Sequence, residues 1–471
     1  MILCILCLFV AESSFINNKR LFYLVAGEGF RLSHHLMYWE EPKKRSWFNL
    51  RVIAWAFFDL GTTIFSMNVI SRYFGLWVTE EMGGSVGDFN DTVSLSLLVA
   101  AITQILLSPI SDELGRRRIF VFGFIMLCVA ACGLLGTAPT LIWGLTLFGI
   151  AHIGYQASMG FYNAMLGDVA DRRHRARVSG IGVGLGYVGS IIGLLVAAKF
   201  VDGTNHVYSP AFWVTAVLVL VFSLPLFLFV REAPSLVRLN LAESLTNSVG
   251  SFMTTLRRIA RHREMLFFFI GCLLALDAVH TVIVNMTLYC KNVVGLDPSR
   301  GFDFSPGWNF QYTVSEIDMF LITSTFFAII GAFGLGHISD KTSHYRTLMG
   351  VLILWMVALV LAMFSVQRAL FWITGPLFGL GFGGIWTVSR AYLQELCHPE
   401  ERGQMFAIFG LVGRGAAIIG TFIWARVFRF CEPIFGERKS YRFAIAAVLG
   451  LLALGFWVML YARPKTEKRP Q

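Results

Sequence analysis

Charged residues are scarce in this chain. Only 14% of its 471 residues are Asp, Glu, Lys or Arg, whereas a soluble globular protein carries about 25%. Hydrophobic residues make up 56% of the chain. This composition excludes a soluble enzyme, a disordered chain and a nucleic-acid-binding domain, and it predicts a protein embedded in a lipid bilayer.

Cysteine is also sparse and scattered. Of the eight cysteines, Cys4 and Cys7 form a C-x-x-C pair without a second Cys or His pair nearby, and Cys128 and Cys132 lie four residues apart in an apolar stretch. This spacing excludes a disulfide scaffold and does not fit a zinc site. No nucleophile–base pair falls on a common face. The sequence therefore predicts neither a metal nor a cofactor, and no enzymatic activity.

Long apolar stretches are what the chain has instead. Each is long enough to cross a bilayer as a helix, and the longest would form two helices if the chain turns at Gly136–Thr140, where Gly and Pro break regular structure. The predicted spans cover residues 51–78, 92–111, 119–167 (two helices), 178–198, 203–230, 265–290, 319–339, 347–367, 369–389, 403–425 and 443–462. We therefore predict an all-α membrane protein with twelve transmembrane helices.

The distribution of Lys and Arg predicts the orientation. Loops on the side of the two termini carry about three times as many basic residues as the opposite loops, which places both termini in the cytoplasm. One loop on the opposite side, between residues 426 and 442, disagrees because it holds five basic residues. The predicted domains are an N-terminal arm (1–45), two six-helix bundles (46–230 and 265–462), a cytoplasmic central loop (231–264) and a cytoplasmic tail (463–471).

The two predicted bundles resemble each other in sequence. Ile110-Ser111-Asp112 recurs as Ile338-Ser339-Asp340, and the segment after Gly154 recurs after Gly381, both at an offset of about 227 residues. The first helix of each half also contains Asp-x-x-x-Thr, at residues 59–63 and 277–281. A single register held across charged loops indicates an internal duplication, as in many transporters.

This plan resembles the major facilitator superfamily of transporters. The run Asp112–Arg118 is similar to the signature of that superfamily, D-x-x-G-R followed by two basic residues, while in the second half Ser343–Tyr345 replace the Gly-Arg-Arg part. The resemblance implies that these residues form a charge clasp at the cytoplasmic gate, and an ordinary positive-inside loop is the alternative. The candidate gating residues are Asp112, Gly115, Arg116, Arg117, Arg118, Gly336 and Asp340.

Three further segments resemble one family within this superfamily. Residues 55–59, 162–189 and 389–414 are similar to the autophagy-related vacuolar amino-acid effluxers and their bacterial relatives, and residues 276–282 are similar to the seventh helix of that family. The chain departs from the family pattern at Gly167, Arg414 and Thr421. The resemblance implies export of a small solute, with amino acids as candidates.

Two carboxylates, Asp59 and Asp277, are predicted inside the membrane. A lone Asp at the centre of a bilayer costs about 2.5–3.5 kcal/mol, so each needs a partner, a proton or water. They could share a proton, bind the ammonium group of a substrate, or pair with Arg390 or Arg414, and a structural ion pair is the alternative. Further polar residues could face the same cavity or make hydrogen bonds between helices: Thr63, Asn68, Tyr162, Asn163, His280, Thr281 and Asn285.

Two local features add to this prediction. Arg72 is expected near one end of the first helix, with its guanidinium group reaching the interface. The G-x-x-x-G pairs Gly180–Gly184 and Gly182–Gly186 predict close packing between helices rather than a dinucleotide site, because a spanning helix lacks the strand that such a site requires.

The sequence thus favours a monomeric secondary transporter that works by alternating access, with protons as a candidate coupling ion and the lipid bilayer as its surroundings. The expected location is the inner membrane of a bacterium, or an organelle membrane in a eukaryote. The alternatives are a flippase for lipids or lipid-linked substrates, and a membrane sensor or scaffold that transports nothing. No nucleic-acid partner is expected.

Overall fold

The computed structural model describes residues 49–463 apart from a set of short gaps and one long one. The gaps are residues 115, 170–174, 203, 231–249, 251–252, 255–256, 258, 298–300, 305–311, 366–367, 397–404, 406–407, 411 and 414–417. The predicted arm 1–45, most of the central loop and most of the tail lie outside the described residues.

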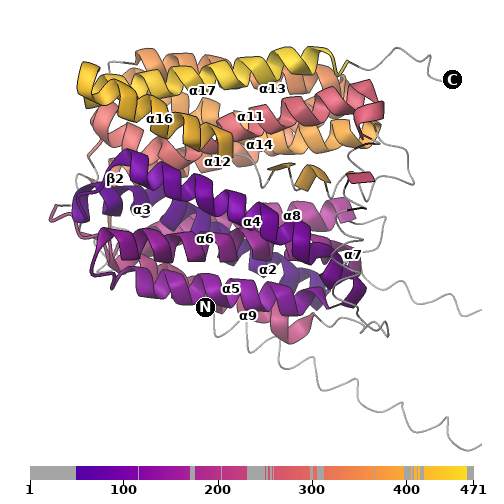
Figure 1. Ribbon diagram of the computed structural model, residues 1–471, viewed down its shortest axis with the longest axis horizontal. Coiled ribbons are helices and arrows are strands. Elements are labelled where there is room, and N and C mark those ends of the chain that lie inside the picture. The colour runs from indigo at the N-terminus through magenta and orange to yellow at the C-terminus, as the bar shows by residue number, and fades with distance from the viewer. Residues whose placement is uncertain are drawn as a thin grey trace, which may run out of the picture. The chain divides into compact units, whose positions relative to one another are not determined.

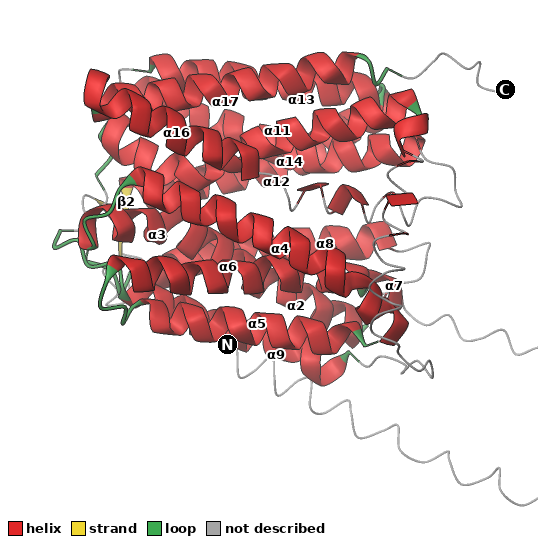
Figure 2. Cartoon of the chain, in the orientation of Figure 1, coloured by secondary structure: helices red, strands yellow, loops and turns green. Residues whose placement is uncertain are grey.

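The described chain is almost entirely helical (Figures 1 and 2). The N-terminal half consists of α2 (Leu50–Phe65), η2 (Ser66–Tyr73), α3 (Phe74–Leu76), η3 (Trp77–Glu81), α4 (Val86–Leu114), α5 (Arg117–Leu135), α6 (Leu141–Ala164), α7 (Leu166–Val169), α8 (Arg175–Ala197) and α9 (Pro210–Phe229). The C-terminal half consists of α11 (Arg263–Tyr289), η4 (Cys290–Val294), β1 (Gly301–Phe304), β2 (Tyr312–Ser315), α12 (Glu316–Lys341), α13 (His344–Phe364), α14 (Arg368–Leu396), α16 (Ile418–Phe435) and α17 (Glu437–Leu460).

The helices begin and end where local chemistry favours it. Asn49 precedes α2, and its side-chain oxygen accepts hydrogen bonds from the backbone N–H groups of Arg51 (3.0 Å) and Val52 (3.2 Å), which the first turn leaves without partners. The predicted break at Gly136–Thr140 is confirmed, because α5 ends at Leu135 and α6 begins at Leu141.

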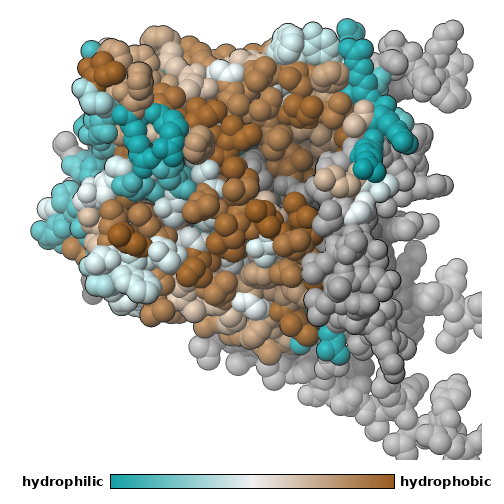
Figure 3. Space-filling view, in the orientation of Figure 1, coloured by the Kyte–Doolittle hydropathy of each residue, from teal (hydrophilic) through white to brown (hydrophobic). Residues whose placement is uncertain are grey.

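The surface of the bundle suits a bilayer. Large apolar side chains such as Ile142 and Phe333 are more than 70% exposed, at 77% and 75%. Hydrophobic residues cover the middle of the face in Figure 3, and most of the hydrophilic residues gather toward its two ends. Such a surface is stable against lipid, while the helices satisfy their own backbone hydrogen bonds.

Within the described residues, ten helices are long and apolar enough to cross a membrane. Two further long helices, α6 and α16, take up places in the predicted order and carry more polar residues, such as His152 in α6 and Arg426 in α16. The predicted all-α membrane fold is confirmed, apart from the short antiparallel pair β1–β2. The count of twelve spans stays a prediction.

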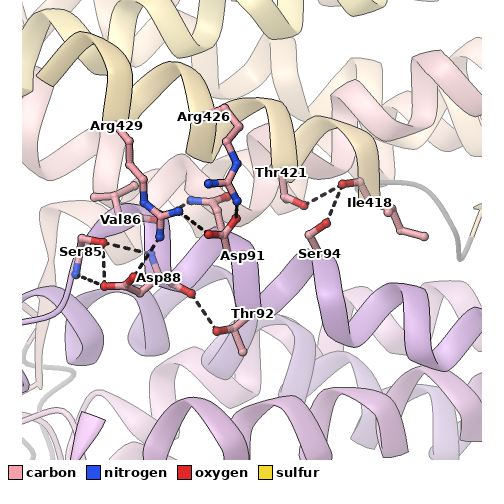
Figure 4. Close-up of polar contacts among 11 residues, drawn as sticks. Ser85, Val86, Asp88, Asp91, Thr92, Ser94, Ile418, Thr421, Arg426 and Arg429 are labelled. Atoms are coloured by element: carbon pink, nitrogen blue, oxygen red, sulfur yellow. Dashed lines mark hydrogen bonds and ion pairs between the residues drawn. The ribbon is translucent and has the colours of Figure 1, made fainter. Parts of the chain in front are cut away.

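The boundary of the eleventh predicted span was wrong. It was expected to end at residue 425, but α16 continues to Phe435, so Arg426 and Arg429 belong to the helix and not to a loop. Both pair with carboxylates at the start of α4: Arg426 with Asp91 at 2.9 Å, and Arg429 with Asp88 at 3.0 Å (Figure 4). These ion pairs give a structural reason for two of the five basic residues that disagree with the charge rule.

Each half packs mainly against itself. In the N-terminal half α2 contacts α8 and α9, and in the C-terminal half α12 contacts α14 and α11 contacts α17. Contacts between the halves include those of α4 with α16, of α8 with α12, and of η2 and α3 with α11. We call the end of the bundle at which α3 and β2 lie the α3 end; α7 lies at the opposite end (Figure 1).

One of the two predicted glycine pairs makes the close contact. A Cβ atom at Gly182 would lie 2.9 Å from the Trp55 ring, and one at Gly186 would lie 2.8 Å from the Thr63 hydroxyl. Among the described residues nothing lies within 4 Å of a Cβ atom added at Gly180 or Gly184, so the prediction was wrong for that pair. The side of α8 that carries Gly182 and Gly186 is therefore the side that faces α2.

Because one face of α8 packs on α2 and another does not, we expect Gly→Ala variants on the two faces to differ in stability. At Gly189 a Cβ would lie 2.4 Å from the carbonyl oxygen of Leu60. We expect Gly189→Ala to lower the free energy of unfolding by about 1–3 kcal/mol, because backbone cannot move aside as a side chain can. The control Gly184→Ala should leave it unchanged or raise it by up to about 1 kcal/mol, since alanine favours helix. Thermal unfolding of the two purified variants measures the difference, and equal melting temperatures would contradict this packing.

Candidate functional site

Two opposite charges from different halves lie near each other within the spanning helices. Asp59 is on α2 in the N-terminal half, and Arg390 is on α14 in the C-terminal half. The two side chains are close enough for their charges to attract each other. Both keep partial exposure, although the neighbouring residues in their helices, Phe58 and Ser389, are fully buried. Of the predicted partners of Asp59, the structure thus brings Arg390 close.

Glycine makes room for the Asp59 carboxylate. A Cβ atom at Gly182 would lie 3.1 Å from Oδ2 of Asp59, and one at Gly186 would lie 3.8 Å from its Cγ. The backbone carbonyl of Asp59 accepts a hydrogen bond of 2.6 Å from the hydroxyl of Thr63, one turn later. The carboxylate therefore lies against α8 at positions where a larger residue would displace it.

An aromatic stack lies beside Asp59. The rings of Trp55 and Tyr162 are stacked with centroids 4.4 Å apart, and Nε1 of Trp55 donates to the carbonyl oxygen of Tyr162 at 3.3 Å. Tyr162 is 1% exposed, and its hydroxyl makes no hydrogen bond within the described part of the chain. Tyr162 thus has a clear packing role, and its place in a polar cavity stays a prediction.

Arg390 lies over an aromatic surface of its own helix. Its guanidinium carbon is 5.5 Å from the ring centre of Trp386, a distance at which a cation is attracted to the ring face. The ring of His280, on α11, meets the same Trp386 ring edge-on at 5.8 Å. His280 and Trp386 both keep partial exposure, so the predicted candidate His280 joins the surroundings of Arg390.

A second aromatic contact crosses between the halves. Tyr187 on α8 packs edge-on against Phe382 on α14, with ring centroids 6.3 Å apart. Tyr187 is within electrostatic range of both Asp59 and Arg390. The site thus combines one acid, one base and aromatic walls contributed by both halves.

Asp277 occupies a different environment. It is 1% exposed and lies against α16, where a Cβ atom at Gly420 would be 3.1 Å from its Oδ2. The hydroxyl of Thr281 donates to the backbone carbonyl of Asp277 at 2.7 Å, as Thr63 does to Asp59. Both copies of Asp-x-x-x-Thr therefore adopt the same local structure opposite a glycine.

Of the predicted polar residues, two asparagines bond to other helices and a third is exposed. Asn68 donates to the carbonyl of Gly193 and to Thr215, both at 3.0 Å, and is fully buried. Asn285 exchanges hydrogen bonds of 2.8 and 2.9 Å with Asn90. Both make the interhelical hydrogen bonds that were the alternative prediction, and Asn163 is exposed.

The predicted gating motif is only partly described. Gly115 lies outside the described residues, as does the side chain of Asp112; so does Arg414, the other predicted partner of the membrane carboxylates. Arg117 donates to the carbonyl of Ala164 at 3.3 Å, and Arg118 donates to the carbonyl of Val230 at 2.7 Å. These two arginines thus join neighbouring helix ends within the N-terminal half.

The other fully described motif residues are not engaged in this way. Arg116 and Asp340 are exposed, and a Cβ atom at Gly336 would lie 3.1 Å from the Thr387 side chain.

The prediction for Arg72 was wrong. Arg72 does not reach the interface but is 2% exposed and paired with Asp318 of the other half. This partner could not be inferred from the sequence, because Asp318 directly precedes a predicted apolar span and looks like an ordinary loop residue. Trp386 and Tyr187 were also missed as site residues, since an aromatic residue in a spanning helix is more often part of ordinary packing.

Polar residues also join loops to helices at the α3 end. The hydroxyl of Tyr208 donates to Glu80 at 2.7 Å, and Lys291 of the other half pairs with the same carboxylate. Burial and the neighbouring Glu80 raise the pKa of Tyr208, so its hydroxyl stays protonated and keeps donating. Within the described residues no group of His, Cys, Asp and Glu could hold a metal ion.

Comparison with known proteins finds relatives over most of the chain. Residues 91–469 match the family described as "Vacuole effluxer Atg22 like". A protein of Aquifex aeolicus is 25% identical over 417 residues, which cover 87% of this chain and 96% of that protein. The MFS-type transporter YxiO of Bacillus subtilis is 23% identical over 429 residues, which cover 86% of this chain and 94% of YxiO.

Solved structures share the fold at low sequence identity. The nucleoside transporter NupG superimposes with a TM-score of 0.63 at 13% identity, over 88% of this chain and 99% of NupG. A bacterial homologue of the human lysosomal transporter Spinster, in an inward-facing and occupied conformation, gives a TM-score of 0.63 at 13% identity, over 88% of this chain and 95% of that one.

Proposed function

Because the chain belongs to the vacuole effluxer Atg22-like family and is a multi-pass membrane transporter of the major facilitator type, we propose that it moves a small zwitterionic solute, such as an amino acid, by alternating access. The family resemblance inferred from the sequence is confirmed by the family match and by the named relatives. The solute, the direction and the coupling ion are the proposed parts.

One observation carries this proposal: Asp59 and Arg390 offer opposite charges from opposite halves. An amino acid carries an ammonium and a carboxylate group, and each would find its complement in one of these side chains. A solute that bridges them interacts with both halves at once. Its binding therefore favours the conformation in which the halves enclose it, as alternating access requires.

A proton is the proposed coupling ion and Asp277 its proposed carrier. Asp277 is buried on α11, the counterpart of α2 in the duplicated plan, and a carboxylate in a spanning helix is by default a functional candidate. We place the α3 end outside and both termini in the cytoplasm, on the evidence of the basic loops. Export across a bacterial cell membrane by a monomer completes the proposal.

A ligand panel tests the proposed solute class. The melting temperature of the purified protein is measured with each amino acid, with the amine that lacks its carboxylate and with the acid that lacks its ammonium group, at pH 5.5 and 7.5. A solute that binds the folded state at 100 times its Kd stabilises it by about 2.7 kcal/mol. We expect the intact amino acid to raise the melting temperature and both single-charge analogues to do so far less.

Two results would contradict this solute class. Equal shifts with an amino acid and its single-charge analogue would show that only one charge is recognised. A shift with lipids but none with any amino acid would favour the flippase that the sequence left as an alternative.

A further inference from the structure

Ion pairs of differing exposure join the halves at the α3 end, and the pair of Glu80 with Lys291 described above is one of them. The rim pairs, which link Asp88 and Asp91 of α4 to Arg426 and Arg429 of α16, have side chains between 30% and 49% exposed (Figure 4). By contrast, the side chains of Arg72 and Asp318 are 2% and 4% exposed. Salt and water screen the rim pairs, but they do not reach the buried pair.

The buried pair is part of a small hydrogen-bonded group that we call the latch, formed by Arg72, Ser315 and Asp318. Nε of Arg72 donates to Oδ1 of Asp318, and Nη2 donates to the Ser315 hydroxyl at 3.1 Å. That hydroxyl donates to Oδ2 of Asp318 at 2.7 Å. Both carboxylate oxygens of Asp318 therefore have a donor, one of them from the opposite half.

The position of the latch relates it to movement between the halves. Arg72 lies in η2, a stretch of π-helix in the first spanning helix, and Asp318 lies in the first turn of α12. π-Helical turns are rare and occur often at functional sites. The Nη1 atom of Arg72 is buried without a hydrogen-bond partner in the described part of the chain. The closed arrangement thus leaves one strong donor unsatisfied, which water could satisfy if the halves separated.

We propose that the latch holds the α3 end shut in the conformation seen here and separates each time the site opens toward that end. This inference rests on the proposed alternating access and identifies the residues that control one of its two gates. The reason lies in the cost of desolvation. In the closed state each buried charge is compensated by its partner, whereas in the open state water hydrates both charges.

This mechanism predicts opposite effects for one substitution and for two. Arg72→Met leaves the Asp318 charge buried without its cation, which destabilises the closed end, so the open population should rise. Arg72→Met combined with Asp318→Leu replaces the pair by apolar side chains that favour burial, so the open population should fall below that of the unmodified protein. A purely structural pair would shift neither population.

The experiment measures distances between spin labels at both ends of the protein in lipid nanodiscs. One label pair, at Thr204→Cys and Glu432→Cys, reports on the α3 end, since both residues are exposed there and belong to different halves. A second pair, at Arg116→Cys and Lys341→Cys, reports on the opposite end in the same way. The matched control is Asp91→Asn with Arg426→Gln, which removes the two rim pairs that Asp91 makes, with Arg426 and with Arg429.

We expect Arg72→Met to raise the ratio of open to closed α3 end at least tenfold, with a reciprocal shortening at the opposite end, and the double variant to lower it. The rim control should change the ratio less than threefold. Label distances that are the same in all variants, or that change at one end only, would overturn the latch. Because this readout needs no solute, a wrong solute class would leave it intact.

Discussion

Replacement of Arg390 by glutamine is expected to weaken the binding of a zwitterionic solute about 10- to 100-fold and to lower its flux by the same factor when the solute is dilute. A hydrogen bond to a charged group contributes about 1.5–3 kcal/mol, and about 1.4 kcal/mol corresponds to a factor of ten in affinity. Glutamine keeps part of the length and the polarity of the side chain but loses the cation. Solute flux in proteoliposomes, measured against concentration, gives both values.

A double variant separates binding from structural pairing. If Asp59 and Arg390 only stabilise each other, then Asp59→Asn with Arg390→Gln should restore both melting temperature and flux, because no charge is left alone. If they bind solute, the double variant should restore the melting temperature but not the flux. Arg426→Gln serves as the matched control, since Arg426 is a partly exposed arginine of the same half that pairs at the rim. Restored flux in the double variant would refute the proposed site.

Replacement of Asp277 by asparagine is expected to abolish solute accumulation driven by a pH gradient while exchange of solute for solute continues. Asparagine has nearly the same size and cannot take up or release a proton, so coupling is lost and the translocation step remains. Because Asp277 is 1% exposed and packs against Gly420, the substitution must preserve volume. Accumulation and equilibrium exchange are measured in the same proteoliposomes with and without the gradient.

The control for this prediction is Asp202→Asn. Asp202 is exposed in the loop before α9, where its side chain accepts hydrogen bonds from the backbone of Thr204 and Asn205. It should accumulate solute as the unmodified protein does. Normal accumulation by Asp277→Asn would refute the coupling role, and loss of exchange as well as accumulation would assign Asp277 to the translocation step itself.

The sequence predicted the fold well because membrane helices obey strong local rules. A spanning helix needs a long apolar stretch, and the break between α5 and α6 needed only the Gly and Pro of the turn. The same local rules placed the end of α16 wrongly, because they assign the charged residues Arg426 and Arg429 to a loop. In the structure both stay in the helix, where Asp88 and Asp91 pair with them. Only the packing of α4 on α16 brings these partners together.

The candidate site was predictable as residues but not as an arrangement. A carboxylate in an apolar span singles out Asp59 and Asp277, because such groups are costly in lipid, and Arg390 is a candidate partner next to a predicted span. The sequence left Arg390 and Arg414 as alternative partners of Asp59, and it left open whether Asn68 and Asn285 face a cavity or bond to other helices; the folded chain brings Arg390 near Asp59 and engages both asparagines with other helices. These are contacts between segments far apart in the chain, and local pattern carries no information on them.

The reciprocal amide pair between Asn90 and Asn285 has a consequence for the precision with which the halves close. Apolar surfaces slide over one another with little change in energy, whereas two amides that exchange hydrogen bonds of 2.8 and 2.9 Å match in only one rotational setting. A single buried asparagine fixes the register of many coiled coils in this way, at some cost in stability. The pair would thus fix the register of α4 against α11, so that the two helices return to the same position after each cycle. The closed state would be somewhat less stable than with an apolar contact at this place.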